Sequence, residues 1–125
     1  MKTKWFNFSF SWLSRKKIKN YSKIVFVDSR RKIPDIIDNK IYLVGYEGFL
    51  KWAIFNCPCN QKNRVEVNLM KSKNPYWEST YFGKKISLYP SIAIDEKCYC
   101  HFWLKNNKAY VYEEDHLTGV NRSRI

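Results

Sequence analysis

The sequence is poor in glycine, histidine and acidic residues, and it has no long hydrophobic run. None of its 125 residues fall in a stretch of about eighteen consecutive apolar positions, so no membrane-spanning helix is predicted. The N-terminus starts with basic residues, but Asn7, Ser9 and Ser11 interrupt its apolar part. No small-residue cleavage site follows it, so no signal peptide is predicted. We therefore expect a cytoplasmic protein, a compartment in which thiols stay reduced.

Several catalytic signatures are missing as well. There is no Gly-rich phosphate loop, no Gly-x-Ser-x-Gly, and no His-x-Glu ahead of paired cysteines. The chain has only 2 histidines, so general acid–base chemistry has few candidate residues. Of these, His116 lies within "EEDH" and is interpreted as a solvated tail residue. The motifs therefore favour a non-catalytic protein.

Acidic residues are scarce relative to basic ones. The chain has 23 Lys and Arg against 11 Asp and Glu, and residues 1–32 hold ten of the basic residues and a single acid, Asp28. Such an end can attract nucleic acid, anionic lipid or an acidic protein, or it can simply aid solubility. For nucleic acid, Trp5 or Tyr21 could stack on bases. The candidate phosphate-binding residues are Lys16, Lys17, Lys19, Arg30, Arg31 and Lys32.

What the chain has in abundance is aromatic residues, 18% of the total, and these favour half-buried β-strands. No stretch shows a 3.6-residue period. We predict one all-β domain over residues 1–125, a small sandwich or partly open barrel of about seven or eight short antiparallel strands with two metal-binding loops. A basic aromatic arm is expected at 1–22 and a loose tail at 114–125. The expected strands are 5–13, 23–28, 40–46, 51–58, 65–70, 78–82, 85–94 broken at Pro90, and a hairpin in 101–114 that turns at Asn106–Asn107.

The inward positions of these strands give a candidate hydrophobic core. The residues expected in it are Val25, Leu43, Ile54, Val67, Leu69, Ile86, Phe102 and Leu104.

All 4 cysteines lie in two Cys-x-Cys pairs, Cys57 with Cys59 and Cys98 with Cys100, and His101 follows the second pair directly. Thiolate and imidazole are the ligands that Zn²⁺ prefers, although the usual ligand spacing has two to four intervening residues. If a strand begins at Cys100, Cys100 and His101 point to opposite faces, and one of them leaves the metal for the core. Two ligand sets remain open: Cys57, Cys59, Cys98 and His101, or all four cysteines.

The four thiols could also serve purposes other than structural zinc. Free cysteines can serve as small core residues. A disulfide or redox dithiol conflicts with the expected compartment. The arrangement is similar to a Rieske iron–sulfur centre, but that centre needs two histidines. Structural zinc is the interpretation that the ligand chemistry favours.

The segment from Trp52 to Tyr112 resembles a family of small, largely uncharacterised bacterial proteins that are predicted to bind zinc. These proteins are often encoded beside bacterial ubiquitin-like conjugation genes. The similar stretches are "FNCPC", "VNLM", the tryptophan at 77, "SLYPSI" and "CYCHFWLKNNKAYVY". The family pattern has Cys-Pro-Cys, then Pro-Ser-Ile or Pro-Ser-Val, then Cys-x-Ser-His-Phe.

On that pattern, the resemblance implies that Cys57, Cys59, Cys98 and His101 are metal ligands. Cys100 stands where the family tends to have Ser, which implies that it is not an essential ligand. Asn60 and Gln61 replace a Gly and a further Cys of the family. The resemblance also implies a protein partner, namely a ubiquitin-like modifier or its conjugation enzymes.

Three functions follow. The first is a non-catalytic, zinc-stabilised protein-binding or adaptor component of a bacterial ubiquitin-like modification pathway, with Phe55, Tyr99 and Trp103 as possible anchors. The second is a nucleic-acid-binding zinc module that uses the basic N-terminal third. The third is a zinc-dependent hydrolase or peptidase acting on modifier conjugates, which requires an open coordination position. The first is the favoured hypothesis.

Overall fold

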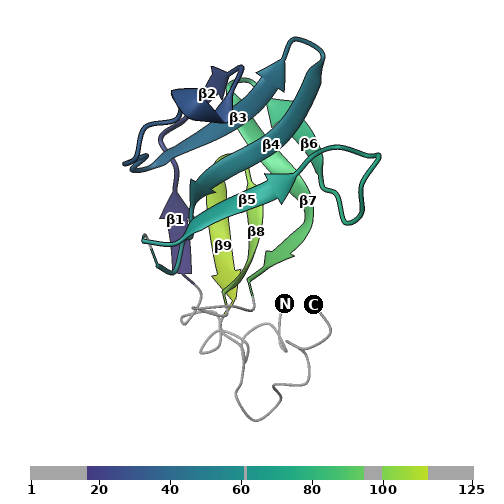
Figure 1. Ribbon diagram of the computed structural model, residues 1–125. Coiled ribbons are helices and arrows are strands. Elements are labelled where there is room, and N and C mark those ends of the chain that lie inside the picture. Colours follow the sequence, from purple (N-terminus) through teal and green to yellow (C-terminus); the bar gives the residue numbers. More distant parts are fainter. Residues whose placement is uncertain (1–16, 61, 95–99, 113–125) are drawn as a thin grey trace.

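A computed structural model describes residues 17–60, 62–94 and 100–112, which form two β-sheets packed face to face (Figure 1). The expected all-β sandwich is confirmed, and the sheets do not close into a barrel. In the described residues, no helix is long and apolar enough to cross a membrane. The expected strand at 5–13 and the tail 114–125 lie outside the described residues.

The larger sheet has five antiparallel strands in the order β1-β9-β8-β7-β6. Their bounds are β1 Lys17–Asn20, β6 Glu78–Phe82, β7 Lys85–Ala93, β8 His101–Lys105 and β9 Lys108–Tyr112. β8 and β9 form the expected hairpin, whose turn residues Asn106 and Asn107 have φ of 50° and 65°. Asn tolerates this left-handed conformation well, which explains the turn. β7 runs through Pro90, with a register shift between Leu88 and Ile92 instead of a break.

The smaller sheet has four strands in the order β2-β3-β4-β5. Their bounds are β2 Lys23–Val27, β3 Lys40–Tyr46, β4 Phe49–Asn56 and β5 Arg64–Asn68. One pair, β2 with β3, is parallel and so differs from the antiparallel expectation. Because the two strands are parallel, the connection between them must bring the chain back to the end of the sheet at which β2 begins. This connection includes the short 3-10 helix η1 (Arg30–Lys32).

Part of the expected N-terminal arm belongs to the domain. β1 pairs with β9 in the larger sheet, and the chain then crosses at Tyr21 to β2 in the smaller one. The Tyr21 side chain is buried, its N–H donates to Asn107 O at 2.8 Å, and its hydroxyl donates to Asn56 O at 2.6 Å. Residues 17–22 therefore tie the two sheets together.

The main core fills the space between the sheets. Of the expected core, Leu43, Val67, Ile86, Phe102 and Leu104 are buried in it, and Leu69 packs partly buried against it. Ile54 and Val25 belong to a second cluster on the outer face of the smaller sheet, around Ile37. The β2–β3 connection covers this face, so strands of the smaller sheet carry apolar residues on both sides.

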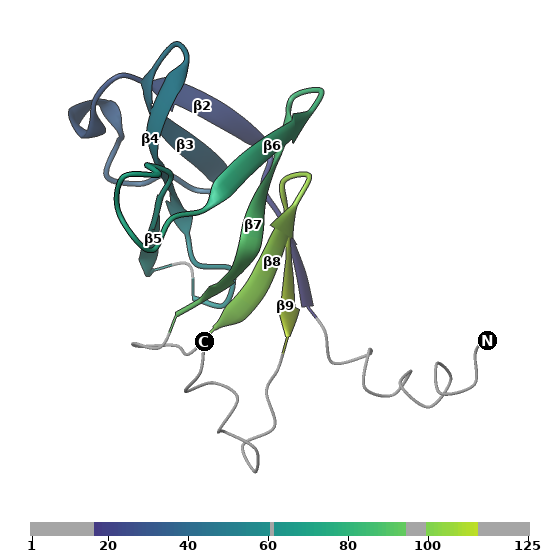
Figure 2. The same ribbon diagram turned by 90° about the vertical axis from the view of Figure 1, so that its right-hand side faces the viewer.

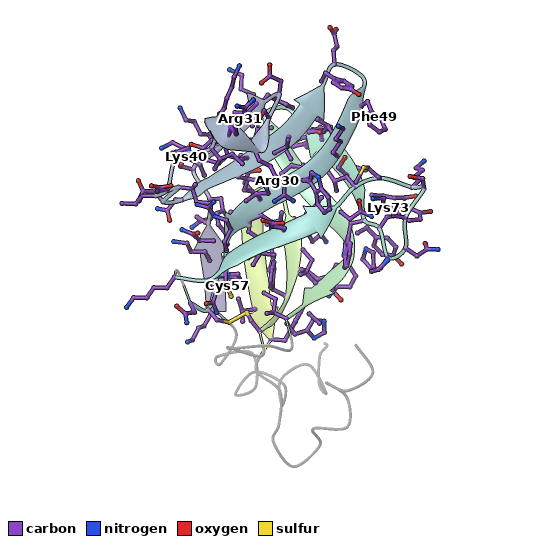
Figure 3. All side chains as sticks on the ribbon, viewed as in Figure 1. Arg30, Arg31, Lys40, Phe49, Cys57 and Lys73 are labelled. Atoms are coloured by element: carbon purple, nitrogen blue, oxygen red, sulfur yellow. A yellow bond between two sulfur atoms is a disulfide. The ribbon has the colours of Figure 1, made fainter. Side chains whose placement is uncertain are left out.

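The two ends of the sandwich differ. At one end, the tips of the β3–β4 and β6–β7 hairpins stand apart (Figure 2). At the other end, Cys57 lies beyond β4 and far from Phe49, and a disulfide lies beside it (Figure 3). The sulfurs therefore join the sheets at the end opposite the separated hairpins.

Candidate active site and thiol cluster

Cys100 and His101 lie on opposite faces of the larger sheet. Cys100 is buried in the main core, and its carbonyl accepts a hydrogen bond from Ile94 N at 2.7 Å. His101 begins β8 opposite Ala93 and faces away from the core, because side chains alternate along a strand. Of these two neighbours, the structure therefore brings Cys100, and not His101, to the other sulfurs.

The sulfur atoms of Cys57, Cys59 and Cys100 form one group, within 4.8 Å of one another. Cys57 N donates to Asn63 O at 2.8 Å, and Cys59 N donates to Cys57 Sγ at 3.4 Å, so the β4–β5 loop holds the buried Cys57 and the exposed Cys59 close together. Four thiolates around one Zn²⁺, each about 2.3 Å away, lie roughly 3.8 Å apart. The donor type of this group fits a metal ion, whereas the sulfurs of Cys59 and Cys100 lie closer together than that spacing, at bonding distance.

Cys59 and Cys100 are joined as a disulfide in the structure, with their Cα atoms 6.2 Å apart. The sequence expectation was a set of reduced thiolates, so the pairing differs from it. Cys98 lies outside the described residues. Among the described residues considered as ligands, the structure places Cys57, Cys59 and Cys100 together and His101 on the other face of the sheet.

The hydroxyl of Tyr21 lies close to the thiol group. Burial, and secondarily the charge of Cys57, raises the pKa of Tyr21 above its ordinary value of 10.0. The Tyr21 phenol therefore stays protonated and keeps its bond to Asn56 O, next to Cys57.

The imidazole of His101 meets a serine. Its Nε2 lies 3.0 Å from Ser91 Oγ, at hydrogen-bonding distance, in a half-buried position. Ser91 lies on β7, and β7 pairs with β8 through Ala93 and His101, so two adjacent strands hold the two side chains. A serine hydroxyl bonded to a histidine nitrogen is the geometry of a nucleophile with its general base.

Ser91 is fixed by its main chain as well. The indole Nε1 of Trp77 donates to the Ser91 carbonyl at 3.2 Å. Trp77 N in turn donates to Asn68 O at 2.9 Å, at the end of β5. The Asn68 side chain donates to the carbonyls of Met70, Lys73 and Pro75 at 3.2, 3.0 and 2.9 Å. Asn68 therefore anchors the β5–β6 loop, and this loop positions Trp77 against the main-chain carbonyl of Ser91.

Tyr112 of β9 lies opposite His101 in the register, and their rings are 5.9 Å apart at 56°. Burial raises the pKa of Tyr112, so its phenol remains neutral beside the imidazole. The neighbouring outer face carries Tyr89 and Trp103, whose ring centroids are 5.8 Å apart. The serine and histidine thus lie on a half-buried aromatic face.

Comparison with known families shows the family to which the chain belongs. The family model described as "Bacterial ubiquitination-like system serine protease (BubE)" matches residues 26–112, about 70% of the chain. The chain belongs to this family. The BubE match includes Ser91, His101 and all four cysteines, of which the structure describes Cys57, Cys59 and Cys100. The link to a bacterial ubiquitin-like system, expected from the resemblance, is thereby confirmed, whereas the zinc motif is not. No curated protein and no solved structure matches the chain.

Ser91 is not among the residues that the sequence motifs predict. The Gly-x-Ser-x-Gly motif places a nucleophile at a strand-to-helix turn, but in this chain the serine lies within a strand. The available signal was that Pro-Ser-Ile and Cys-x-x-His-Phe both belong to the BubE-like stretch. The expected anchor Phe55 is fully buried in the core, so it is not exposed for a partner; Tyr99 lies outside the described residues.

The candidate nucleic-acid residues are divided between two places. Lys17 and Lys19 lie on β1, whereas Arg30, Arg31 and Lys32 form η1 on the other sheet. Several already have partners. Arg30 binds both Glu66 oxygens at 2.9 and 2.8 Å, and Lys32 pairs with Asp28 at 3.1 Å. Lys16 lies outside the described residues.

Proposed function

We propose that this protein is a serine hydrolase of a bacterial ubiquitin-like system, with Ser91 as nucleophile and His101 as general base. The single observation that carries this proposal is the 3.0 Å separation of Ser91 Oγ and His101 Nε2. Membership of a family described as serine proteases supports it. The bond that is cleaved is the one between the carbonyl carbon of the ubiquitin-like modifier and its target or a C-terminal extension.

The chemistry follows from the two side chains. His101 Nε2 takes the hydroxyl proton of Ser91 while Oγ attacks the substrate carbonyl carbon, which gives a tetrahedral intermediate. The bond to the leaving group breaks as His101 returns that proton to it, and an ester on Ser91 remains. Water then gives a proton to His101 and attacks the ester, and the proton returns to Ser91 Oγ as the acid is released.

The thiol group has a structural role in this proposal. Cys57, Cys59 and Cys100 would hold zinc, with Cys98 completing the four-cysteine set, which is the alternative to the set with His101 that the sequence favours. Bound zinc would supply cross-linking between the β4–β5 loop and the segment before β8. Because Cys100 directly precedes His101, fixing Cys100 also fixes the start of the strand that carries the base. No step of the reaction uses the metal.

A fluorophosphonate probe tests the nucleophile directly, because it reacts with activated serine hydroxyls and not with unactivated ones. We expect a covalent adduct on the peptide that contains Ser91, identified by mass spectrometry. Ser91→Ala and His101→Asn should abolish it. Ser87→Ala is the matched control, because Ser87 lies on the same strand and its hydroxyl contacts the Asn106 backbone instead of a histidine.

The competing proposals give different results. A non-catalytic adaptor would show no adduct at Ser91 in the folded wild-type protein. A zinc-dependent hydrolase would cleave modifier conjugates without labelling and would stop when a chelator removes the metal. Cleavage that survives Ser91→Ala would reject the serine mechanism.

Nucleic-acid binding has one observation in its favour. A hollow of about 280 Å³ is lined by four lysines, and no acidic residue lines it. These lysines are Lys23, Lys84, Lys85 and Lys108. If it bound phosphates, Lys84→Gln with Lys85→Gln would weaken oligonucleotide binding and flatten its salt dependence, whereas Lys71→Gln with Lys73→Gln would not.

A further inference from the structure

A groove of about 1360 Å³ opens between the two sheets at the end away from the thiols. It is bounded by β2, the β3–β4 hairpin, the β5–β6 loop and β6. Four of its lining aromatics are exposed: Phe26 by 62%, Tyr46 by 57%, Phe49 by 47% and Tyr81 by 46%. Large apolar side chains gathered in one concave surface mark a binding site more strongly than single exposed ones.

The size and the charge of the groove narrow the class of ligand. Pockets for small molecules usually measure about 300–1,000 Å³, so this groove is large for one. Its charged lining residues are of both signs, namely Asp28, Lys32, Glu47, Lys71 and Glu78. A polyanion would require positive charge without acids. An extended peptide fits better, because its backbone is neutral and its side chains can enter the aromatic hollows.

The groove comes close to Ser91 through one side chain, although Ser91 itself is not among the residues that line it. Trp77 lines the groove, and the same side chain donates its indole N–H to the Ser91 carbonyl at 3.2 Å. β6, at the edge of the larger sheet, also lines the groove. β6 pairs with β7 only as far as Glu78 opposite Tyr89, so Ser91 lies just beyond the end of this pairing. The Ser91 hydroxyl faces the outer side of the larger sheet, so a chain that leaves the groove past Trp77 would reach it around the end of β6.

We propose that this groove binds an extended apolar segment of the protein substrate, adjacent to the bond that Ser91 attacks. The occupant has large apolar side chains and lies along β6, where strand addition gives main-chain hydrogen bonds and the groove selects side chains. This inference rests on the proposed function. It assigns substrate selection to Phe49 and its aromatic neighbours, on hairpins remote from the thiols.

The experiment compares two substrates on the full-length protein. The first is p-nitrophenyl acetate, which is too small to reach the groove. The second is a series of fluorogenic peptide amides with one to six residues, with Leu and Phe at alternating positions. Phe49→Ser and Tyr81→Ser are the groove variants. Phe82→Ser is the matched control, because Phe82 is 75% exposed and does not line the groove.

We expect kcat/KM of the wild type to rise at least tenfold with peptide length. Phe49→Ser and Tyr81→Ser should each remove most of that gain and leave ester hydrolysis unchanged, whereas Phe82→Ser should retain both. Equal peptide rates in groove variants and control would overturn the inference while the serine mechanism stands. Ester hydrolysis that persists in Ser91→Ala would instead overturn the proposed function. Thermal unfolding checks each variant, and Tyr46→Ser replaces any that does not fold.

Discussion

Cys100 and His101 are adjacent in the chain, yet they serve different sites. The sulfur of Cys100 belongs to a group with Cys57 and Cys59 within 4.8 Å, and the imidazole of His101 lies 3.0 Å from Ser91 Oγ. The peptide between them thus couples a candidate structural cluster to a candidate catalytic pair. We therefore expect a distortion at one site to shift the start of β8 and to disturb the other site.

Metal content should distinguish the proposed role of His101 as a base from that of the cysteines as metal ligands. We expect His101→Asn to keep the zinc content of the wild-type protein, measured by elemental analysis, and to lose hydrolysis, because His101 is not in the sulfur group. Cys57→Ser should lose both zinc and the folded state, since binding energy at a structural site is folding energy. Zinc lost from His101→Asn would restore histidine as a ligand and remove the base.

The effects of replacing the two side chains that we propose to be catalytic should be non-additive. Ser91→Ala should lower kcat by about 10³-fold or more, and His101→Ala by a similar factor, because each removes the same proton-transfer step. The double variant should be no slower than the single ones. Single-turnover rates give the measurement, and multiplied effects would show that Ser91 and His101 do not act as a unit.

Asn68 should act as a positioning residue for Trp77. Its side chain makes three hydrogen bonds to carbonyls of the β5–β6 loop and accepts one from Met70 N at 3.0 Å. We expect Asn68→Ala to cost about 1–3 kcal/mol of unfolding free energy and to reduce the hydrolysis of long peptides. Chemical denaturation and peptide kinetics measure both effects. Asn63→Ala, in another loop, is the control and should leave peptide hydrolysis unchanged.

Alkaline pH should reveal the contribution of Tyr21 to the stability of the fold. Because burial raises its pKa above 10.0, the unfolded chain ionises first as pH rises, and stability is lost above pH 10. Below that pH, Tyr21→Phe should be less stable by about 1 kcal/mol, the contribution of the bond to Asn56 O. The difference should shrink by about 1.4 kcal/mol per pH unit above 10. Urea unfolding from pH 8 to 11 measures it, and a constant difference would contradict the shift.

Gly45 should tolerate no side chain. Its φ is +153°, and a Cβ there would collide with the Phe49 carbonyl and lie 2.8 Å from Leu50 Cα, both in the backbone. We expect Gly45→Ala to destabilise the protein by about 2–4 kcal/mol and to distort the bulge between Val44 and Gly45. Gly48→Ala is the control: its φ of +81° is strained, but nothing lies within 4 Å of its Cβ. A smaller loss at Gly45 than at Gly48 would reject this reasoning.

The sequence by itself determined the β class and most strand positions. Alternation placed Leu43, Val67 and Phe102 in the core, and Asn106–Asn107 marked the β8–β9 turn, because both signals are local. It also determined that Cys100 and His101 face opposite ways if a strand begins there, since the period of a strand is two. It could not decide which of the two stays with the other thiols.

Only the tertiary structure determined which side chains and strands contact one another. Ser91 contacts His101 because β7 pairs with β8 in one register, and a shift of either strand by one residue would turn its side chain to the core and separate the pair. The parallel pairing of β2 with β3 moved Val25 and Ile54 to a second cluster, a choice that depends on which strand lies alongside. Pairing between strands is a non-local interaction. Hydrophobic alternation shows which face of a strand is buried. Which side chains pack against that face is determined only when the sheets assemble.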